Sequence, residues 1–306
     1  MPEPRRHHLV PQMYLKRFAD HKQRIVMVSR DQKKRLPGQH IREVCAQTDY
    51  YTVETGNGPS QEVEKLLSRI EGEANTAIER MINGEFPPSA TDREAVALFI
   101  GYQCLRGDES RQMVEQLSDT MYKFVMSHMT GESLIENFRK REGREPTKAE
   151  IDAQSFILNN PDAFTVKPHQ NEIVRGMLEI APEVASIMLR RRWFLGDHGE
   201  PCLLTSDTPV VSWSERTSAD AHYGRGWGNA DEIRMPLSPR HSLCLVWNEE
   251  FKERMIPFGR KLGPEIAAGM NQLVAHRARR WIFHHPDTDP LKGITLSPVD
   301  PVLTVG

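Results

Sequence analysis

Two adjacent histidines near the N-terminus, His7 and His8, are the first residues whose types suggest chemistry. Near neutral pH a histidine serves as a general base, a general acid or a metal ligand. The nearby Gln12, Tyr14 and Arg17 add an amide, a phenol and a guanidinium that suit substrate binding. Neighbouring side chains of an extended segment point to opposite sides, so the two histidines are not expected to share one metal. An equal alternative is a structural pair whose ring N–H groups bind buried backbone carbonyls.

A second candidate is the short segment Ser206-Asp207-Thr208-Pro209, which lies between two apolar runs and therefore at a strand end or a hairpin. A carboxylate there could bind a metal or orient a histidine. We predict that His8 and Asp207 act together, either directly or through a divalent metal ion whose identity such a pair does not determine. Ser206 lacks a GxSxG elbow, so we assign it to substrate binding. The alternative is an Asx turn in which Asp207 accepts backbone N–H groups ahead of Pro209.

Three further polar residues lie on predicted helices. Glu71 lies at the edge of an apolar stripe, where its carboxylate could point into a catalytic cleft. Gln103 and Arg106 are three residues apart and so share one helix face, where the guanidinium could clamp a phosphate or carboxylate. The alternatives are a solvated helix face for Glu71 and a buried ion pair for Arg106.

The elements that must position these residues are strands at both ends of the chain and helices between them. Apolar runs predict strands at 24–29 and 50–55, and several short strands after residue 192. Periodicity predicts helices at 60–82, over much of 89–126, and at 147–158, 169–192 and 264–279, with a kink or break at Pro182. The expected class is α+β, with an antiparallel sheet formed by N-terminal and C-terminal strands around a large helical region. We expect one compact unit over 1–306, divided into strands at 1–60, helices at 61–192 and a sheet with one helix at 193–306.

Composition favours a globular protein. Of 306 residues, 38% are hydrophobic and 27% are charged, and the four cysteines form no CxxC pair. No apolar run approaches a membrane span, and the basic N-terminus is not followed by the apolar stretch of a signal peptide, so we expect a cytoplasmic protein. Residues 1–45 hold 11 Lys and Arg against 4 Asp and Glu, which suits an anionic ligand such as nucleic acid. Packing of this basic segment against the acidic helical region is the alternative.

The segment His7 to Phe18 resembles the opening HH-x-VPQ-x-YL-x-x-F of a widespread bacterial family of unknown function. Two later elements strengthen this resemblance: Thr205 to Val210 is similar to the family's TSDxPV element, and Pro236 to Pro239 to its PLSP element. Asn271 stands where the family has an asparagine, so the resemblance adds it to the binding residues. The resemblance implies a shared fold over most of the chain and no established activity.

These residues lead us to expect a hydrolase that acts on an anionic substrate, such as a phosphodiester in a nucleic acid or nucleotide. His8 is the expected base or metal ligand and Asp207 its partner, with His7 and Glu71 also in the catalytic group. Analogy with other mobile bacterial families suggests a toxin or a phage-defence effector. The competing hypothesis is a non-enzymatic module that binds a ligand or a protein, in which the HH-x-VPQ segment is a structural clasp.

Overall fold

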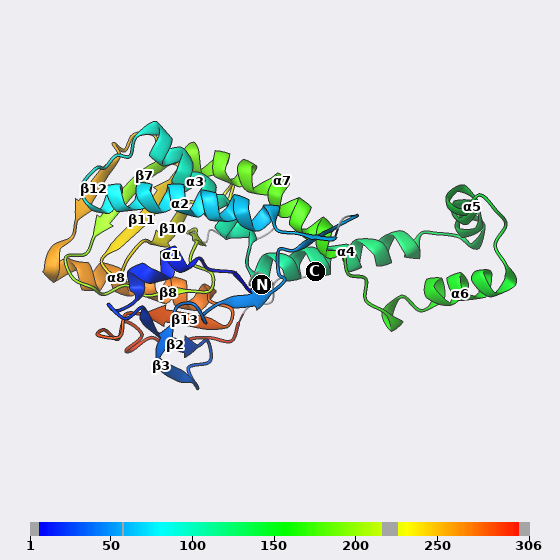
Figure 1. Ribbon diagram of the computed structural model, residues 1–306, viewed down its shortest axis with the longest axis horizontal. Coiled ribbons are helices and arrows are strands. Elements are labelled where there is room, and N and C mark those ends of the chain that lie inside the picture. The colour runs from blue at the N-terminus through cyan, green and yellow to red at the C-terminus, as the bar shows by residue number, and fades with distance from the viewer. Residues whose placement is uncertain (1–5, 57, 216–225, 300–306) are drawn as a thin grey trace.

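The computed structural model describes residues 6–56, 58–215 and 226–299. Alternating apolar residues in the second half of the chain form its larger sheet (Figure 1). Its described strands, in spatial order, are β12 (Arg254–Pro257), β7 (Arg192–Asp197), β11 (His241–Val246), β10 (Glu232–Pro236) and β9 (Val211–Trp213). Neighbours are antiparallel except β12 and β7, which are parallel. One face carries a row of fully buried side chains, namely Trp193, Leu195, Ile233, Met235, Leu243 and Leu245. The alternate residues therefore point to the opposite face.

Strands from both ends of the chain share a second, antiparallel sheet. Its described strands, in spatial order, are β3 (Arg35–His40), β2 (Arg24–Ser29), β13 (Trp281–His284) and β8 (Thr205–Ser206). The expected α+β class, with N-terminal and C-terminal strands in one sheet, is confirmed. Two short ribbons pair β1 (Arg6–His8) with β4 (Ala46–Thr48) and β5 (Val53–Thr55) with β6 (Gly58–Ser60). The strand predicted at 50–55 is shorter than expected, because Tyr50 and Tyr51 lie in a turn.

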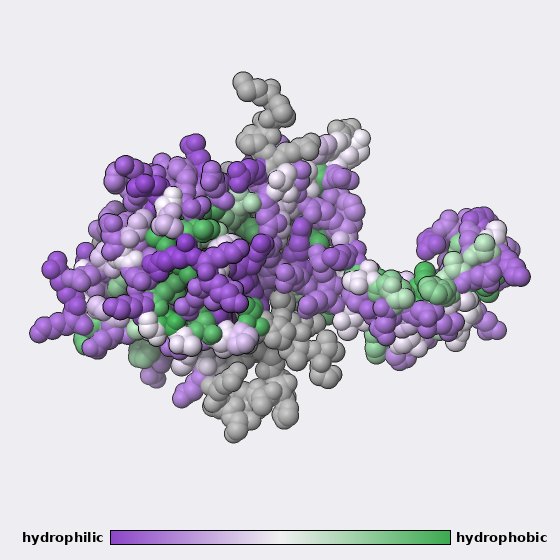
Figure 2. Space-filling view, turned by 90° about the horizontal axis from the view of Figure 1, so that it is seen from below, coloured by the Kyte–Doolittle hydropathy of each residue, from purple (hydrophilic) through white to green (hydrophobic). Residues whose placement is uncertain are grey.

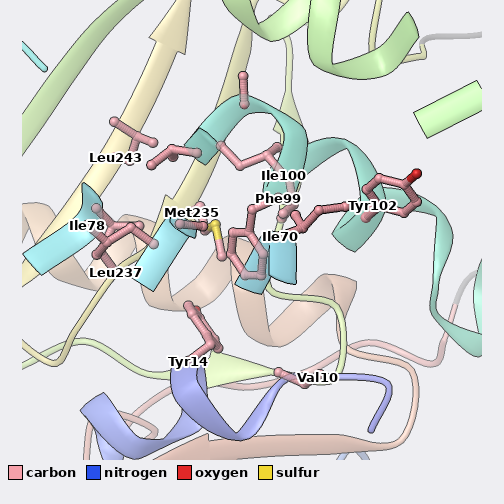
Figure 3. Close-up of a cluster of buried hydrophobic side chains, with 14 of the residues drawn as sticks. Val10, Tyr14, Ile70, Ile78, Phe99, Ile100, Tyr102, Met235, Leu237 and Leu243 are labelled. Carbon is pink, nitrogen blue, oxygen red and sulfur yellow. The ribbon is translucent and has the colours of Figure 1, made fainter. Parts of the chain in front are cut away.

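Three long helices supply the apolar residues that pack on the inner face of the larger sheet: α2 (Glu62–Ile82), α3 (Ala90–Leu105) and α7 (Gln170–Leu189). The last of these continues through Pro182, where the sequence predicted a kink or a break. A short helix, α1 (Gln12–Leu15), closes the other end of this core. Figure 3 shows Tyr14 pointing from α1 toward Phe99 of α3 and Met235 of the sheet.

The helix α8 (Gly259–Arg277) connects the two sheets. Its buried residues Ala267 and Val274 belong to a second apolar cluster, which also contains Val28 of β2 and Ile282 of β13. An earlier part of the same helix lies over the outer face of the larger sheet, where Ile266 lines a cavity. The helix therefore bounds both the second core and the outer face.

The helices α4 (Asp108–Ser127), α5 (Gly131–Glu142) and α6 (Lys148–Asn159) lead away from the two sheets (Figure 1). We call them the arm. Capping boxes begin α5 at Thr130 and α6 at Thr147, which makes both helix starts locally determined. The segment 139–148, predicted as an exposed connection, contains the end of α5, the turn after it and the start of α6.

A close approach of α3 to α7 gives a first testable prediction. A Cβ atom added to Gly101 would lie 2.4 Å from the carbonyl oxygen of Ala181, so Gly101→Ala must push the two helices apart. We expect a loss of about 1–3 kcal/mol in the free energy of unfolding, measured by urea denaturation. Gly72→Ala in α2 is the matched control, because a Cβ there meets open space. It should stabilise the protein by about 0.5–1 kcal/mol. Equal stability of the two variants would contradict the packing described here.

Candidate functional site

The buried side chain of His7 makes a structural hydrogen bond. Its Nδ1 accepts the backbone N–H of Tyr51 at 2.7 Å, and the two rings stack with centroids 5.6 Å apart. Burial lowers the pKa of His7, which keeps the ring neutral and its Nδ1 free to accept. His7 therefore ties β1 to the turn that precedes β5.

His8 lies beside an ion pair between the buried Arg106 and the half-buried Glu71. Its ring Nε2 donates to the Arg42 carbonyl at 3.1 Å, and its own carbonyl accepts from Arg106 Nη2 at 2.6 Å. Nη1 of the same guanidinium donates to the Glu71 carboxylate at 2.6 Å, and Gln103 Nε2 donates to the Leu9 carbonyl at 3.1 Å. The structure thus brings together four of the residues predicted from the sequence, namely His8, Glu71, Gln103 and Arg106, and two of these four hydrogen bonds end on the carbonyls of His8 and Leu9. The clasp hypothesis predicts contacts of this kind, because it makes the HH-x-VPQ segment structural.

Tyr14 of α1 and Arg17 of the 3-10 helix that follows it (Lys16–Phe18) also contact the protein interior. The Tyr14 hydroxyl donates to the Pro236 carbonyl at 2.6 Å and lies 2.7 Å from Thr205 Oγ1. Arg17 Nη2 donates to Asn75 Oδ1 of α2 at 2.7 Å. Gln12 is half-buried at the start of the helix. Tyr14 and Arg17 therefore hold α1 in place.

The Asp207 carboxylate binds the backbone at the start of β13 and just before it. It accepts the backbone N–H groups of Arg279, Arg280 and Trp281 at 2.9, 2.7 and 3.1 Å. Burial raises the pKa of Asp207 to about 6, although these three donors favour the charged form. Ser206 Oγ accepts the backbone N–H of Thr208 at 3.2 Å, which closes the turn.

The Asn271 side chain of α8 binds the backbone of the residues that precede β8. Its Oδ1 accepts the Leu204 N–H at 3.0 Å and its Nδ2 donates to the Cys202 carbonyl at 2.8 Å. Across the described ranges, no three His, Cys, Asp or Glu side chains form a group that could hold a metal ion. The described partners of His8 and Asp207 are separate backbone groups.

A cavity of about 370 Å³ opens on the outer face of the larger sheet. Its floor holds Ser242 of β11 and its wall holds His198, which follows β7. Ser242 Oγ lies 2.9 Å from His198 Nε2, and His198 Nδ1 lies 2.9 Å from the Gly263 carbonyl oxygen of α8. Only an N–H can bind the carbonyl, so the proton is on Nδ1 and Nε2 accepts the serine O–H. This is the arrangement of a nucleophile, a base and a group that orients the base.

Two glycines make this contact possible. A Cβ atom at Gly196 would lie 2.8 Å from Ser242 Oγ and 2.7 Å from the Phe258 ring. A Cβ atom at Gly263 would overlap the His198 carbonyl at 1.9 Å. The absence of side chains at these positions lets α8 and His198 approach the sheet and leaves space beside the serine.

Charged groups and aromatic side chains surround the serine. Arg234 binds Glu232 at 2.6 Å and lies over the Trp213 ring at 5.2 Å. The Cys244 thiol donates to Glu232 at 3.3 Å, and burial raises its pKa to about 12, so it remains protonated. Burial lowers the pKa of His198, which keeps the imidazole neutral near pH 7. The available nucleophile of this cavity is therefore the serine.

Sequence reasoning did not find Ser242 or His198. The two residues are 44 positions apart and belong to no motif, and only the register of β7 and β11 brings them together. One signal was present. Ser242 and Cys244 are polar or small residues that alternate with the apolar Leu243 and Leu245, which is typical of a strand with one face that is not fully buried.

The clasp contacts of His7 give a second prediction. His7→Ala leaves the Tyr51 N–H buried without its acceptor, so the free energy of unfolding should fall by about 1–3 kcal/mol. His21→Ala is the matched control, because His21 is exposed, and its stability should equal that of the wild type. Equal melting of His7→Ala and wild type would contradict the structural role and leave His7 free for chemistry.

The same residue predicts a dependence on pH. The folded-state pKa of His7 lies below the unfolded value, so the unfolded chain binds protons first as the pH falls. The stability that His7 contributes is present above about pH 6.5 and is lost below it. The stability difference between wild type and His7→Ala should therefore shrink from pH 7 to pH 5 in urea titrations.

Comparisons with known proteins agree with the resemblance found in the sequence. Residues 6–288 match a family described as a protein of unknown function (DUF4238). No curated protein and no solved structure matches the chain. No helix in the described part of the chain has both the length and the apolar composition that a membrane span requires. Because the match covers most of the sequence, the chain belongs to the DUF4238 family of proteins of unknown function.

Proposed function

We propose that the protein is a hydrolase that cleaves an acyl ester or thioester, with Ser242 as the nucleophile and His198 as its base. The observation that carries this proposal is the Ser242–His198–Gly263 chain of hydrogen bonds, with distances of 2.9 Å and 2.9 Å, inside a cavity. A backbone carbonyl here takes the part of the third residue of a triad, because it holds the imidazole in one tautomer.

The reaction follows from the positions of the protons. His198 Nε2 removes the proton of Ser242 as Oγ bonds to the substrate carbonyl carbon. The protonated imidazole then gives this proton to the departing alkoxide or thiolate, and an acyl-serine remains. A water molecule, deprotonated by the same Nε2, attacks the acyl carbon and releases the acid and the free serine. Gly263 accepts from Nδ1 throughout and stabilises the charged imidazolium.

The lining of the cavity suggests the class of substrate. Its walls are largely apolar, with side chains that suit an acyl chain, namely Phe194, Phe251, Ile256, Phe258 and Met270. Arg234 and Arg254 also line it and could bind a carboxylate or phosphate of the substrate, or the oxyanion of the intermediate. The proposed substrate is therefore an acyl compound with an apolar chain and an anionic group, which retains the anionic substrate expected from the sequence.

The phosphodiesterase hypothesis based on His8 and Asp207 stays a prediction from the sequence, as does its divalent metal ion. Incubation of the purified protein with RNA and DNA, in the presence of Mg²⁺ or EDTA, tests it directly. Cleavage by wild type that is lost in His8→Ala would support it. Retention of that cleavage in His8→Ala would reject it.

A non-enzymatic binding module is the second candidate, and the clasp contacts of His7, His8 and Arg106 favour it. Under this hypothesis the HH-x-VPQ segment is structural and the same cavity holds an apolar anion without turnover. Release of acid from a bound ester separates the two candidates.

Removal of the serine tests the proposed reaction. A fluorophosphonate probe should label the wild type covalently at Ser242, and the protein should hydrolyse p-nitrophenyl esters of short acyl chains. Ser242→Ala should lose both reactions, and His198→Gln should lower the rate about 10²–10⁴-fold because the general base is gone. Ser118→Ala, a serine of α4 outside the cavity, is the control and should react like the wild type. A folded wild type that is neither labelled nor active would reject the proposal.

The state of His198 sets the pH dependence of the reaction. Its pKa is lowered by burial, and the imidazole must be neutral to act as the base. The rate of labelling should therefore be at its plateau by pH 7 and fall only below about pH 6.5. A plateau reached only above pH 8 would mean that another group is the base.

A further inference from the structure

One side of α4 in the arm is apolar and exposed. Val114, Leu117, Met121 and Phe124 expose 37%, 48%, 58% and 65% of their surface. We call these four residues the seam. Their spacing of three, four and three residues is the a/d repeat of a coiled coil, which brings all four side chains into one stripe. Figure 2 shows hydrophobic residues along the projecting arm, among polar ones.

The end of α4 contacts one seam residue, because the rings of Phe124 and His128 have centroids 4.5 Å apart. Met126 is buried, and Tyr122 packs edge-on against Phe164 from another side of α4. Asp119 accepts the Val166 N–H at 2.8 Å on that same side. At 100° per residue, this side is turned well away from the seam. Apart from the His128 ring on Phe124, the seam therefore faces away from these contacts of α4 with its own chain.

The positions that flank the seam carry no charge. They are Met113, Ser118, Thr120 and Val125. Charged residues of the same helix are paired elsewhere: Glu115 with Lys167 at 3.4 Å, and Asp119 with Lys123 at 2.9 Å. Two copies of an uncharged seam meet without repulsion, whereas a seam bordered by one sign of charge would require a different partner.

The sizes of the seam residues complement one another when the helix is reversed. In an antiparallel pair centred between Leu117 and Met121, the small Val114 faces the large Phe124 of the other copy, and Leu117 faces Met121. Each layer then holds a similar side-chain volume, as close packing requires. A parallel pair would place Phe124 against Phe124 and Val114 against Val114. The antiparallel pair is isologous, with each residue contact occurring twice about a two-fold axis.

We propose that the arm is a dimerisation device, in which the α4 seam packs antiparallel against the α4 seam of a second copy of this chain. The arrangement places the two bodies at opposite ends of the paired helices. The proposal is independent of the reaction assigned to Ser242.

Sedimentation equilibrium of the full chain tests the proposal. The wild type should have twice the chain mass of 35.1 kDa at micromolar concentration. Leu117→Glu, which places carboxylates in the central layers, should weaken the dimer more than about tenfold. Gln116→Glu adds the same charge at the next residue, outside the seam, and should remain dimeric. A wild type of single chain mass at all concentrations, or a dimeric Leu117→Glu, would overturn the proposal.

Two further variants guard against misfolding and test the orientation. Met121→Lys added to Leu117→Glu places opposite charges across the antiparallel interface and should restore the dimer. Val114→Cys and Phe124→Cys chains, mixed and treated with a short bismaleimide, should cross-link to each other and not to themselves. Cross-linking of Val114→Cys to itself would show a parallel pair and overturn the proposed geometry.

Discussion

The arrangement of the two sheets depends on the hydrogen bonds of the Tyr14 hydroxyl group. It donates to the Pro236 carbonyl of β10 in the larger sheet and lies within hydrogen-bond distance of Thr205 Oγ1 of β8 in the smaller one. The side chain is fully buried, so water cannot replace either partner. One phenol therefore joins α1 to both sheets. Its ring meets Phe18 and Phe99, which places this polar junction inside the main apolar core.

The clasp extends this junction to the start of the chain. Arg106 is almost completely buried, and it is stable there because its guanidinium binds both the Glu71 carboxylate and the His8 carbonyl. His7 satisfies the Tyr51 N–H in the same way. The polar residues near the N-terminus thus satisfy buried backbone groups that a short strand cannot satisfy alone. The need to satisfy these backbone groups explains why residue types that are also suited to catalysis gather near the N-terminus, although their described contacts are structural.

The larger sheet has two different faces, and that difference creates the candidate site. Its inner face is filled by residues such as Leu195 and Leu243, whereas its outer face is only partly covered by α8. Gly196 and Gly263 provide the space in which His198 bridges α8 and Ser242. The arm shows the same asymmetry on the scale of one helix, because α4 buries Met126 and exposes Phe124.

The sequence by itself determined the features that depend on local pattern. The periodicity of 60–82 predicted α2, the apolar run at 24–29 predicted β2 to the residue, and the segregation of helices and strands predicted the α+β class. It also singled out Arg106, with a buried ion pair as the alternative to a substrate clamp, and Glu71, with a solvated helix face as the alternative to a catalytic role. Only the tertiary structure showed that these two residues pair with each other. Local pattern could not show whether a polar residue faces a cleft or a backbone group, because hydrogen-bond partners such as Tyr51 for His7 are distant in sequence. The tertiary structure alone decided the Ser242–His198 contact, since it depends on strand register and on the close approach of α8 that two glycines permit.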